Sequence, residues 1–158
     1  MRTIVAETRI AAPPEQVWSL LARTESLRTL SGPELDLAPV ETWPEVLTQG
    51  AVIQFNVRTF GLPMLWACEF VKVEPPHKWV LQQRTSPFRF WQVAETLYPV
   101  GNDTLLEDCI CYAVNGGSIG MAIAAPLLIP KLERIIDHRH RAVHRLIEPA
   151  AAAAAAAR

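Results

Sequence analysis

The sequence predicts an α+β fold in which a curved antiparallel sheet is wrapped around one long C-terminal helix. Two patterns predict it. Residues 35–114 alternate between apolar and polar side chains in short segments separated by turn residues, which is typical of consecutive strands. Residues 131–148 instead repeat apolar side chains at three- and four-residue steps, which is typical of one buried helix face. At about 1.5 Å per residue this helix is about 27 Å long, enough to cross a small domain.

One strand and two short helices are expected before the meander. Residues 3–10 alternate in the manner of a half-buried strand. Pro13 and Pro14 suit the first turn of a helix that ends near Arg23. A second short helix is expected over residues 25–30, because a Ser-Gly-Pro sequence follows it.

Six further strands fit between the turns that contain glycine and proline. Their predicted ranges are 35–42, 51–60, 64–73, 79–85, 88–98 and 104–114. Short connections favour antiparallel neighbours, so a seven-stranded meandering sheet is predicted once the first strand is added. Pro126 and Pro130 predict a kinked or broken segment that leads into the terminal helix.

Composition points to a single globular domain. The chain has 158 residues, half of them apolar, and a formal net charge of −1. This balance excludes the basic character of nucleic-acid binders and the composition of disordered chains. We expect one domain over residues 1–149 and an alanine-rich tail over residues 150–158. The first residues lack the apolar core of a signal peptide, and no apolar run reaches membrane-spanning length, so a cytoplasmic protein without stable membrane insertion is expected. The oligomeric state is left open.

The cysteines and histidines do not predict a metal site. Cys68, Cys109 and Cys111 are odd in number, and we expect reduced, buried thiols. His140 and His144 are one helical turn apart, but no third ligand has a suitable spacing. A solvated basic helix face is the expected setting of these two histidines.

Four short blocks of residues carry a resemblance to a known superfamily. They are Ile10-Ala11-Ala12-Pro13 with Glu15, Val17-Trp18 and Leu20-Leu21; Pro87-Phe88 with Trp91; Thr104-Leu105 with Asp108 and Tyr112; and Gly117-Ser118-Ile119-Gly120 with Arg139. In their order and spacing the chain resembles the START-like, Bet v 1-like (SRPBCC) superfamily, and more narrowly its bacterial polyketide cyclase/dehydrase and lipid-transport-like members. The resemblance implies the helix-grip fold, with a ligand cavity between the sheet and the terminal helix and no cofactor.

The chain departs from its relatives within the expected cavity. Many relatives have an aspartate before the Pro-Phe turn and histidines after the tryptophan, where this chain has Leu81, Val93 and Glu95. The resemblance therefore implies a more apolar cavity here.

Strand alternation selects the residues that face the expected cavity. Trp91, Val93 and Glu95 share one face of their strand, and Asp108 and Tyr112 share one face of the next. The candidate ligand-binding residues are Trp66, Phe70, Leu81, Gln83, Trp91, Val93, Glu95, Asp108, Tyr112, Ile136 and Arg139. The alternative is that the aromatic residues among them only fill a core.

Three charged residues have two interpretations each. Arg139 interrupts the apolar stripe of the terminal helix, so it needs a carboxylate, water or a ligand nearby. A structural salt bridge of Arg139 and Asp108 is favoured over direct contact with a ligand carboxylate or carbonyl. Glu95 is a candidate general base if burial raises its pKa, although a solvent-facing position is the more ordinary one for a strand glutamate.

The function predicted from these patterns is binding of a hydrophobic small molecule, such as a lipid, an isoprenoid or a polyketide-like compound. The alternative is a cyclase- or dehydratase-type enzyme in which Glu95 or Asp108 transfers a proton and Tyr112 or Arg139 polarises a carbonyl. A third hypothesis is an interaction protein that recruits a partner through its basic helix. One scaffold hosts many functions, so the resemblance alone does not separate these hypotheses.

Overall fold

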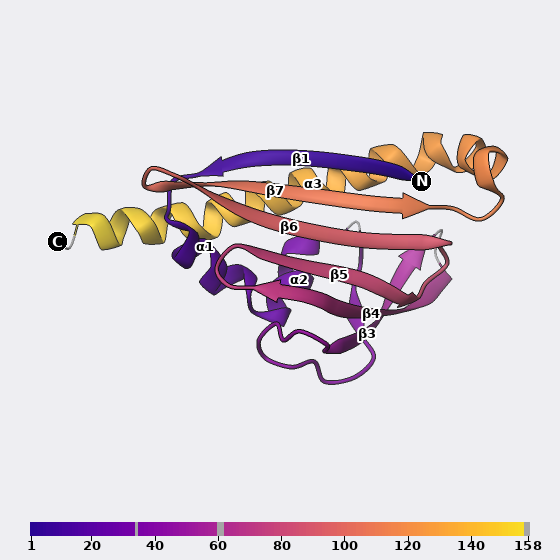
Figure 1. The fold of residues 1–158 in the computed structure, drawn as a ribbon, viewed down its shortest axis with the longest axis horizontal. Helices are drawn as coiled ribbons and strands as arrows, with labels where there is room; N and C mark the ends of the chain where they lie inside the picture. The colour runs from indigo at the N-terminus through magenta and orange to yellow at the C-terminus, as the bar shows by residue number, and fades with distance from the viewer. Residues whose placement is uncertain (34, 60–61, 157–158) are drawn as a thin grey trace.

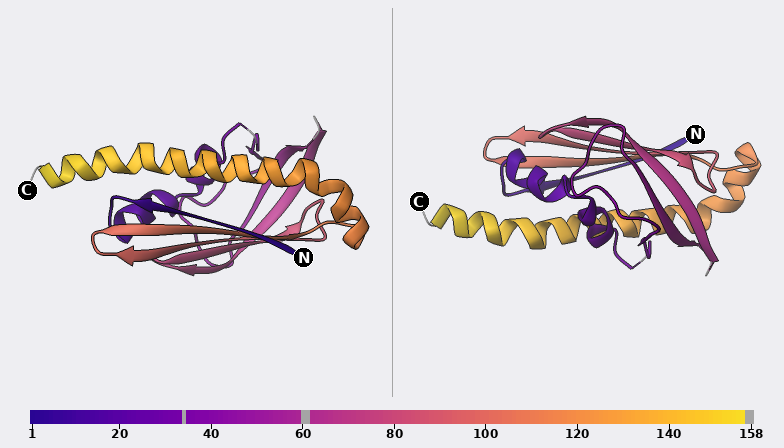
Figure 2. Two further views of the ribbon diagram at one scale, coloured as in Figure 1. Left: turned by 90° about the horizontal axis from the view of Figure 1, so that it is seen from above. Right: turned by 90° about the horizontal axis from the view of Figure 1, so that it is seen from below.

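The computed structural model of the chain describes residues 1–33, 35–59 and 62–156. Within these residues, seven strands form one antiparallel sheet in the order β1-β7-β6-β5-β4-β3-β2. A long helix, α3, crosses one face of the sheet, and two short helices, α1 and α2, lie on the same side (Figures 1 and 2). The predicted helix-grip arrangement is therefore confirmed.

The order of the elements is the predicted one. In chain order they are β1 (Arg2–Ile10), α1 (Pro14–Leu21), α2 (Thr24–Ser31), β2 (Ala38–Pro39), β3 (Val52–Thr59), β4 (Leu62–Glu74), β5 (Lys78–Thr85), β6 (Phe90–Val100), β7 (Asp103–Ala113) and α3 (Gly117–Ala156). Residue 60, at the end of one predicted strand, lies outside the described residues.

The strand predicted over residues 35–42 is wrong in its length. Only Ala38 and Pro39 pair with β3. Pro39 has no N–H to donate, and Asp36 has a φ of 42°, a left-handed conformation that interrupts an extended strand. The segment therefore contributes only a two-residue edge to the sheet.

The terminal helix begins at Gly117, earlier than residue 131. Pro126 and Pro130 lie inside it, and both are exposed, so water can reach the carbonyls that their missing N–H groups leave unpaired. The expected kink is present, because α3 bends in its first turns, drawn in orange in Figure 2. At the other end the helix continues through Ala156, so the described part of the alanine-rich tail is helical.

Most of the predicted apolar stripe of α3 is buried. Leu132, Ile136, Val143 and Ile147 are buried against the sheet and the short helices, as expected, whereas Leu146 is half exposed. Among the described residues no helix is long and apolar enough to span a membrane.

The short helices α1 and α2 close one end of the space between α3 and the sheet. Buried side chains of α1 and α2 share a core cluster with the second half of α3 and the ends of β6 and β7. Thr104 Oγ1 on β7 donates a 2.7 Å hydrogen bond to the carbonyl oxygen of Ala12, which ties the start of α1 to the sheet. Gly32, which follows α2, lies so close to α3 that a Cβ there would be 2.5 Å from His138 Cδ2. This contact seats α2 against α3.

Sheet register aligns three side chains beneath α3. Trp79 on β5 is directly opposite Glu95 on β6, and Glu95 is directly opposite Asp108 on β7. Residues directly opposite one another in antiparallel strands point to the same face. Trp79, Glu95 and Asp108 therefore form a row across three neighbouring strands on the face that α3 covers.

Candidate ligand-binding cavity

A cavity of about 170 Å³ is bounded by side chains of the sheet, of α2 and the segment after it, and of α3. Most of its lining residues are aliphatic or aromatic, and the charged ones are Asp108, Lys131 and Arg139. The lining residues are Leu27, Ser31, Leu35, Leu37, Ile53, Phe55, Val57, Trp66, Cys68, Trp79, Leu81, Phe88, Trp91, Val93, Asp108, Ile110, Leu128, Lys131, Leu132, Ile135, Ile136 and Arg139.

Aromatic rings form one continuous part of this lining. The ring centroids of Trp66 and Trp91 are 5.3 Å apart, and those of Trp66 and Phe88 are 5.5 Å apart. Phe88 and Trp91 lie 4.9 Å apart, and Phe55 stacks on Trp66 at 6.2 Å. These distances are typical of favourable aromatic pairs, so the four rings hold one another in place without a ligand.

The indole N–H of Trp66 is buried and has no hydrogen-bond acceptor among the described residues. Other tryptophans of this chain do have one: Trp43 Nε1 donates to the carbonyl oxygen of Gln54 at 3.0 Å, and Trp79 Nε1 donates to Glu95 Oε1 at 3.3 Å. A buried donor without a partner is costly, and native proteins satisfy most of them with protein groups or water. Trp66 lines the cavity, so one residue of its largely apolar wall carries a buried donor without an acceptor.

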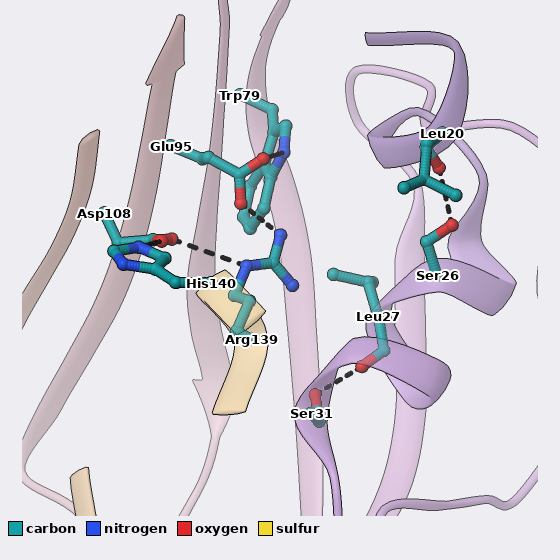
Figure 3. A network of polar contacts seen from close by, with 9 residues as sticks. All are labelled: Leu20, Ser26, Leu27, Ser31, Trp79, Glu95, Asp108, Arg139 and His140. Atoms are coloured by element: carbon teal, nitrogen blue, oxygen red, sulfur yellow. Dashed lines mark hydrogen bonds and ion pairs between the residues drawn. The ribbon is translucent and has the colours of Figure 1, made fainter. Parts of the chain in front are cut away.

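A buried polar network lies where α3 meets the row of three sheet residues (Figure 3). Arg139 donates a hydrogen bond from Nη2 to Glu95 Oε2. Its Nε lies 3.5 Å from Asp108 Oδ1, outside hydrogen-bond geometry, and the second carboxylate oxygen of Asp108 is 2.8 Å from His140 Nε2. The guanidinium carbon of Arg139 also lies 5.9 Å from the ring centroid of Trp79. One guanidinium is thus shared by two carboxyl groups.

Burial shifts the protonation equilibria of this network. It raises the pKa of Glu95 to about 7, and the positive charge of Arg139 opposes this effect. Burial also lowers the pKa of Arg139, but the carboxylates of Glu95 and Asp108 outweigh burial, so the net shift of that pKa is upward. Arg139 therefore stays cationic, while Glu95 changes protonation state near neutral pH.

Seven of the eleven candidate ligand-binding residues line the cavity. They are Trp66, Leu81, Trp91, Val93, Asp108, Ile136 and Arg139. Their role in binding stays a prediction.

The other four candidates do not line the cavity. Phe70 is buried against Trp79, with ring centroids 6.0 Å apart. The side-chain amide of Gln83 donates to the carbonyl oxygens of Phe88 and Arg89 and so holds the turn between β5 and β6. Tyr112 is buried beside the aromatic wall, and burial raises its pKa. Glu95, the fourth, belongs to the polar network.

The structure corrects the expectation about Glu95 and confirms the one about Arg139 and Asp108. The solvent-facing position of Glu95 is wrong, because its side chain is fully buried on the face that α3 covers. The predicted salt bridge of Arg139 and Asp108 is present, with Glu95 as an additional partner.

The solvated basic face expected for the histidines is also wrong. His140 is mostly buried against Asp108. His144 Nε2 lies 2.8 Å from Thr8 Oγ1, and its Nδ1 lies 2.7 Å from Glu148 Oε1. Among the residues that the structure describes, no group of three or more His, Cys, Asp or Glu side chains is arranged to hold a metal ion.

The cysteines are free, as expected, but only Cys68 is buried. Cys109 and Cys111 are half-buried, and their sulfur atoms lie 3.9 Å apart. They alternate with the buried residues of β7 and so lie on the opposite face of the sheet from α3. Burial raises the pKa of the Cys68 thiol to about 12, so this cavity residue is a neutral thiol.

Sequence reasoning missed much of the lining. Ile53, Phe55 and Val57 alternate along a predicted strand, and that signal was sufficient to propose them as lining residues. Trp79 was detectable as the residue opposite Glu95 once strand register is known. Leu27 carries no such signal, because its contact with the cavity depends on how α2 packs against α3.

The fold has clear relatives among solved structures, although no protein-family model and no curated protein sequence matches the chain. Protein TTHA0849 from Thermus thermophilus is similar over 94% of this chain and 99% of its own, with a TM-score of 0.73 and 16% identity. The Zhui aromatase/cyclase from a Streptomyces species is similar over 93% of both chains, with a TM-score of 0.72 and 18% identity.

Norcoclaurine synthase from Thalictrum flavum is a third similar structure. The similarity covers 92% of this chain and 86% of the synthase, with a TM-score of 0.68 and 15% identity. Another structure of that enzyme contains dopamine and hydroxybenzaldehyde. At these identities the similarity establishes the fold and not the activity. The chain has the helix-grip fold of START-like, Bet v 1-like proteins.

Proposed function

We propose that the protein binds a compact, neutral, largely apolar small molecule in the cavity between the sheet and α3. The observation that carries the proposal is a largely apolar cavity whose lining residues include two buried, unpaired donors: Arg139 Nε, which faces Asp108, and the indole N–H of Trp66. Apolar pockets with a few polar groups are the usual form of small-molecule sites. A ligand would gain from burial of its apolar surface and from pairing with this N–H.

The size of the cavity favours a ligand of about one ring. A cavity of 170 Å³ is similar in volume to a cavity of about 150 Å³ that was engineered in another protein and binds benzene. Drug-sized ligands occupy larger pockets, of about 300–1,000 Å³. The contacting rings of Phe55, Trp66, Phe88 and Trp91 suit a flat ligand face. Norcoclaurine synthase, which has a similar fold, is known in complex with two small ring compounds, dopamine and hydroxybenzaldehyde, and each of them has a single ring. A lipid or a polycyclic polyketide would require α2 or α3 to move outward.

The charge balance of the cavity favours a neutral ligand over an anion. Arg139 already faces two carboxyl groups, those of Glu95 and Asp108, and the other lining cation, Lys131, donates to the carbonyl oxygen of Arg58, so neither cation lacks a partner that a ligand carboxylate would replace. A carbonyl, ether or hydroxyl oxygen that accepts from Trp66 Nε1 costs less to bury than a carboxylate. The proposed ligand therefore carries one uncharged acceptor on a compact apolar body.

An enzyme of the cyclase or dehydratase type is the second candidate. It is favoured by Asp108, which lines the cavity and contacts His140, and by the aromatase/cyclase among the similar folds. Against it, Glu95 does not line the cavity, and the carboxylate of Asp108 faces both His140 and Arg139. Turnover of a polyketide-like substrate that is lost in Asp108→Asn would favour this candidate over simple binding.

Binding of acetophenone and of α-methylstyrene tests the proposal. The two probes have nearly the same shape, but only acetophenone has a carbonyl acceptor. We measure both dissociation constants by calorimetry for the wild type and for Trp66→Phe, which keeps an aromatic ring and removes the N–H. A net hydrogen bond contributes about 1 kcal/mol, so the preference for acetophenone relative to α-methylstyrene should fall about five- to tenfold in Trp66→Phe.

Trp43→Phe is the matched control. It also removes an indole N–H, but Trp43 does not line the cavity and donates to the backbone instead. Its relative preference for the two probes should equal that of the wild type. Failure of both probes to bind the wild-type protein would overturn the proposal that the cavity takes a ligand of this size.

A further inference from the structure

The first turns of α3 expose an apolar face that the cavity does not use. Residues 117–130 contain no charged side chain. Ile119, Ile123 and Leu127 are 74%, 75% and 63% exposed. Their spacing of four residues places them along one side of the helix. In Figure 2 these turns bend at the end of the sheet and extend past it, so they protrude from the body of the protein.

Cationic residues lie at the same end of the protein as this apolar face. Lys131 follows it on α3. Arg2 pairs with Tyr112 near the end of β7, and Arg89 directly precedes Phe90, which pairs with Ala113 at the same end. Residues 1–6, 75–94 and 109–132 contain no Asp or Glu. Glu133 is the first acidic residue of α3, so the apolar residues of its first turns have no acidic neighbour on the helix before Lys131.

We propose that residues 117–130 dock on the surface of a bilayer that contains anionic lipid. Apolar helix faces flanked by Lys and Arg bind membranes in this way: the apolar side chains enter the headgroup region, and the cations attract anionic lipids. The docking is peripheral, because no described helix is long and apolar enough to span a membrane.

The composition of the face favours a bilayer over a second copy of the chain. A stable protein interface takes about 20–30 residues from each partner. The three exposed side chains lie on about two helical turns, which is a small part of such an area. Two copies would also bring their cationic groups together, whereas anionic lipid headgroups would neutralise them.

Docking at this face would bring the cavity close to the bilayer. Leu128, Leu132 and Ile135 line the cavity and lie immediately after the exposed residues on the same helix. An apolar molecule dissolved in the bilayer would thus have a short path to the cavity. The proposal does not depend on the cavity ligand, because Ile119, Ile123 and Leu127 are not part of the lining.

Vesicle co-sedimentation of the full chain tests the proposal. The vesicles contain phosphatidylcholine alone or roughly equal amounts of phosphatidylcholine and phosphatidylglycerol. We expect the wild type to bind the mixed vesicles at least tenfold more tightly than the neutral ones, and added NaCl to weaken binding. Ile123→Gln with Leu127→Gln should reduce binding at least tenfold, because these side chains no longer gain free energy by leaving water.

Leu146→Gln is the matched control. Leu146 is also an exposed apolar residue of α3, but it lies near the opposite end of the helix. The Leu146→Gln variant should bind mixed vesicles as tightly as the wild type does. Circular dichroism should show the same helix content in all variants. The proposal is overturned if the wild type does not bind mixed vesicles or if the double variant binds them equally well. A wild-type dimer in light scattering that the double variant loses would assign the face to a second copy instead.

Discussion

Arg139 on α3 donates a hydrogen bond to the carboxylate of Glu95 on β6, and this contact joins the terminal helix to an interior strand of the sheet. The side chains of Arg139 and Glu95 are 10% and 0% exposed. Asp108 contributes a second carboxylate at 3.5 Å from Arg139 Nε. Because both side chains are buried, neither becomes hydrated when its partner is removed. Substitutions in the network and in the cavity beside it should therefore change stability or ligand affinity measurably.

Arg139→Met should destabilise the protein by about 3–5 kcal/mol, because it leaves buried carboxyl groups without their cation. Urea denaturation measures the change in the free energy of unfolding. Arg141→Met is the control, since Arg141 is exposed on the same helix. Equal stability of the Arg139 and Arg141 variants would contradict the prediction.

Glu95 should make the stability of the protein depend on pH near neutrality. Its pKa rises from 4.5 to about 7 on folding, so the folded state holds a proton that the unfolded state releases. The contribution of Glu95 to stability is therefore fully present below pH 4.5 and is lost as the pH rises through about 7. As the pH rises over this range, the unfolding free energy of the wild type should fall relative to that of Glu95→Gln by on the order of 1–3 kcal/mol.

Urea denaturation at several pH values between about 4 and 8 measures this slope. Glu15→Gln, an exposed position in the first turn of α1, shows the effect of removing a carboxylate outside the network. A difference between the wild type and Glu95→Gln that increases with pH would mean that Glu95 is an ionised, stabilising partner of Arg139 throughout this range.

Val93→Phe should fill the cavity. Val93 lies on β6 and lines the empty volume, so the larger side chain has space to occupy. We expect the affinity for acetophenone to fall at least tenfold while stability changes by less than about 1 kcal/mol. Val17→Phe is the control, because Val17 is fully buried in a cluster without this cavity, and overpacking there should cost about 1–3 kcal/mol. Equal destabilisation by both substitutions would show that no usable volume lies beside Val93.

Cys68 should react slowly with alkylating reagents. With a pKa of about 12 in place of 9.0, its thiolate fraction at pH 8 is about a thousandfold smaller than that of an ordinary thiol. Iodoacetamide labelling of a Cys109→Ser, Cys111→Ser variant, followed by mass spectrometry, measures this rate. The same variant in concentrated urea is the control and should react at the ordinary rate. Equal rates in the folded and unfolded states would contradict the burial of Cys68.

Local sequence patterns were sufficient to predict most of the architecture. Alternation along residues 3–10 and 104–114 predicted strands that the structure contains as β1 and β7, and the apolar stripe through Ile136 and Val143 predicted the buried face of α3. The same patterns failed at residues 35–42, where the missing N–H of Pro39 and the left-handed backbone of Asp36 limit pairing to two residues. Periodicity shows which side chains alternate between the two faces of a strand, but not whether the backbone forms hydrogen bonds with a neighbouring strand along its whole length.

The candidate site required information that no single segment contains. Arg139 was recognisable as a buried charge that needs a partner, because it interrupts an apolar stripe. That the partner is Glu95, and that Trp66 Nε1 is left without one, depends on how α3 crosses strands that are distant in sequence.

The sequence by itself determined the element order, the antiparallel meander and the helix face that packs on it, because these follow from side-chain periodicity and turn chemistry within short segments. Only the tertiary structure decided that Glu95 is buried, that His140 contacts Asp108 and that a volume of about 170 Å³ stays unfilled. The physical reason is that burial, ion pairing and empty volume are properties of surfaces that meet across the fold, and the positions of those surfaces are set by the packing of α2 and α3 on the sheet.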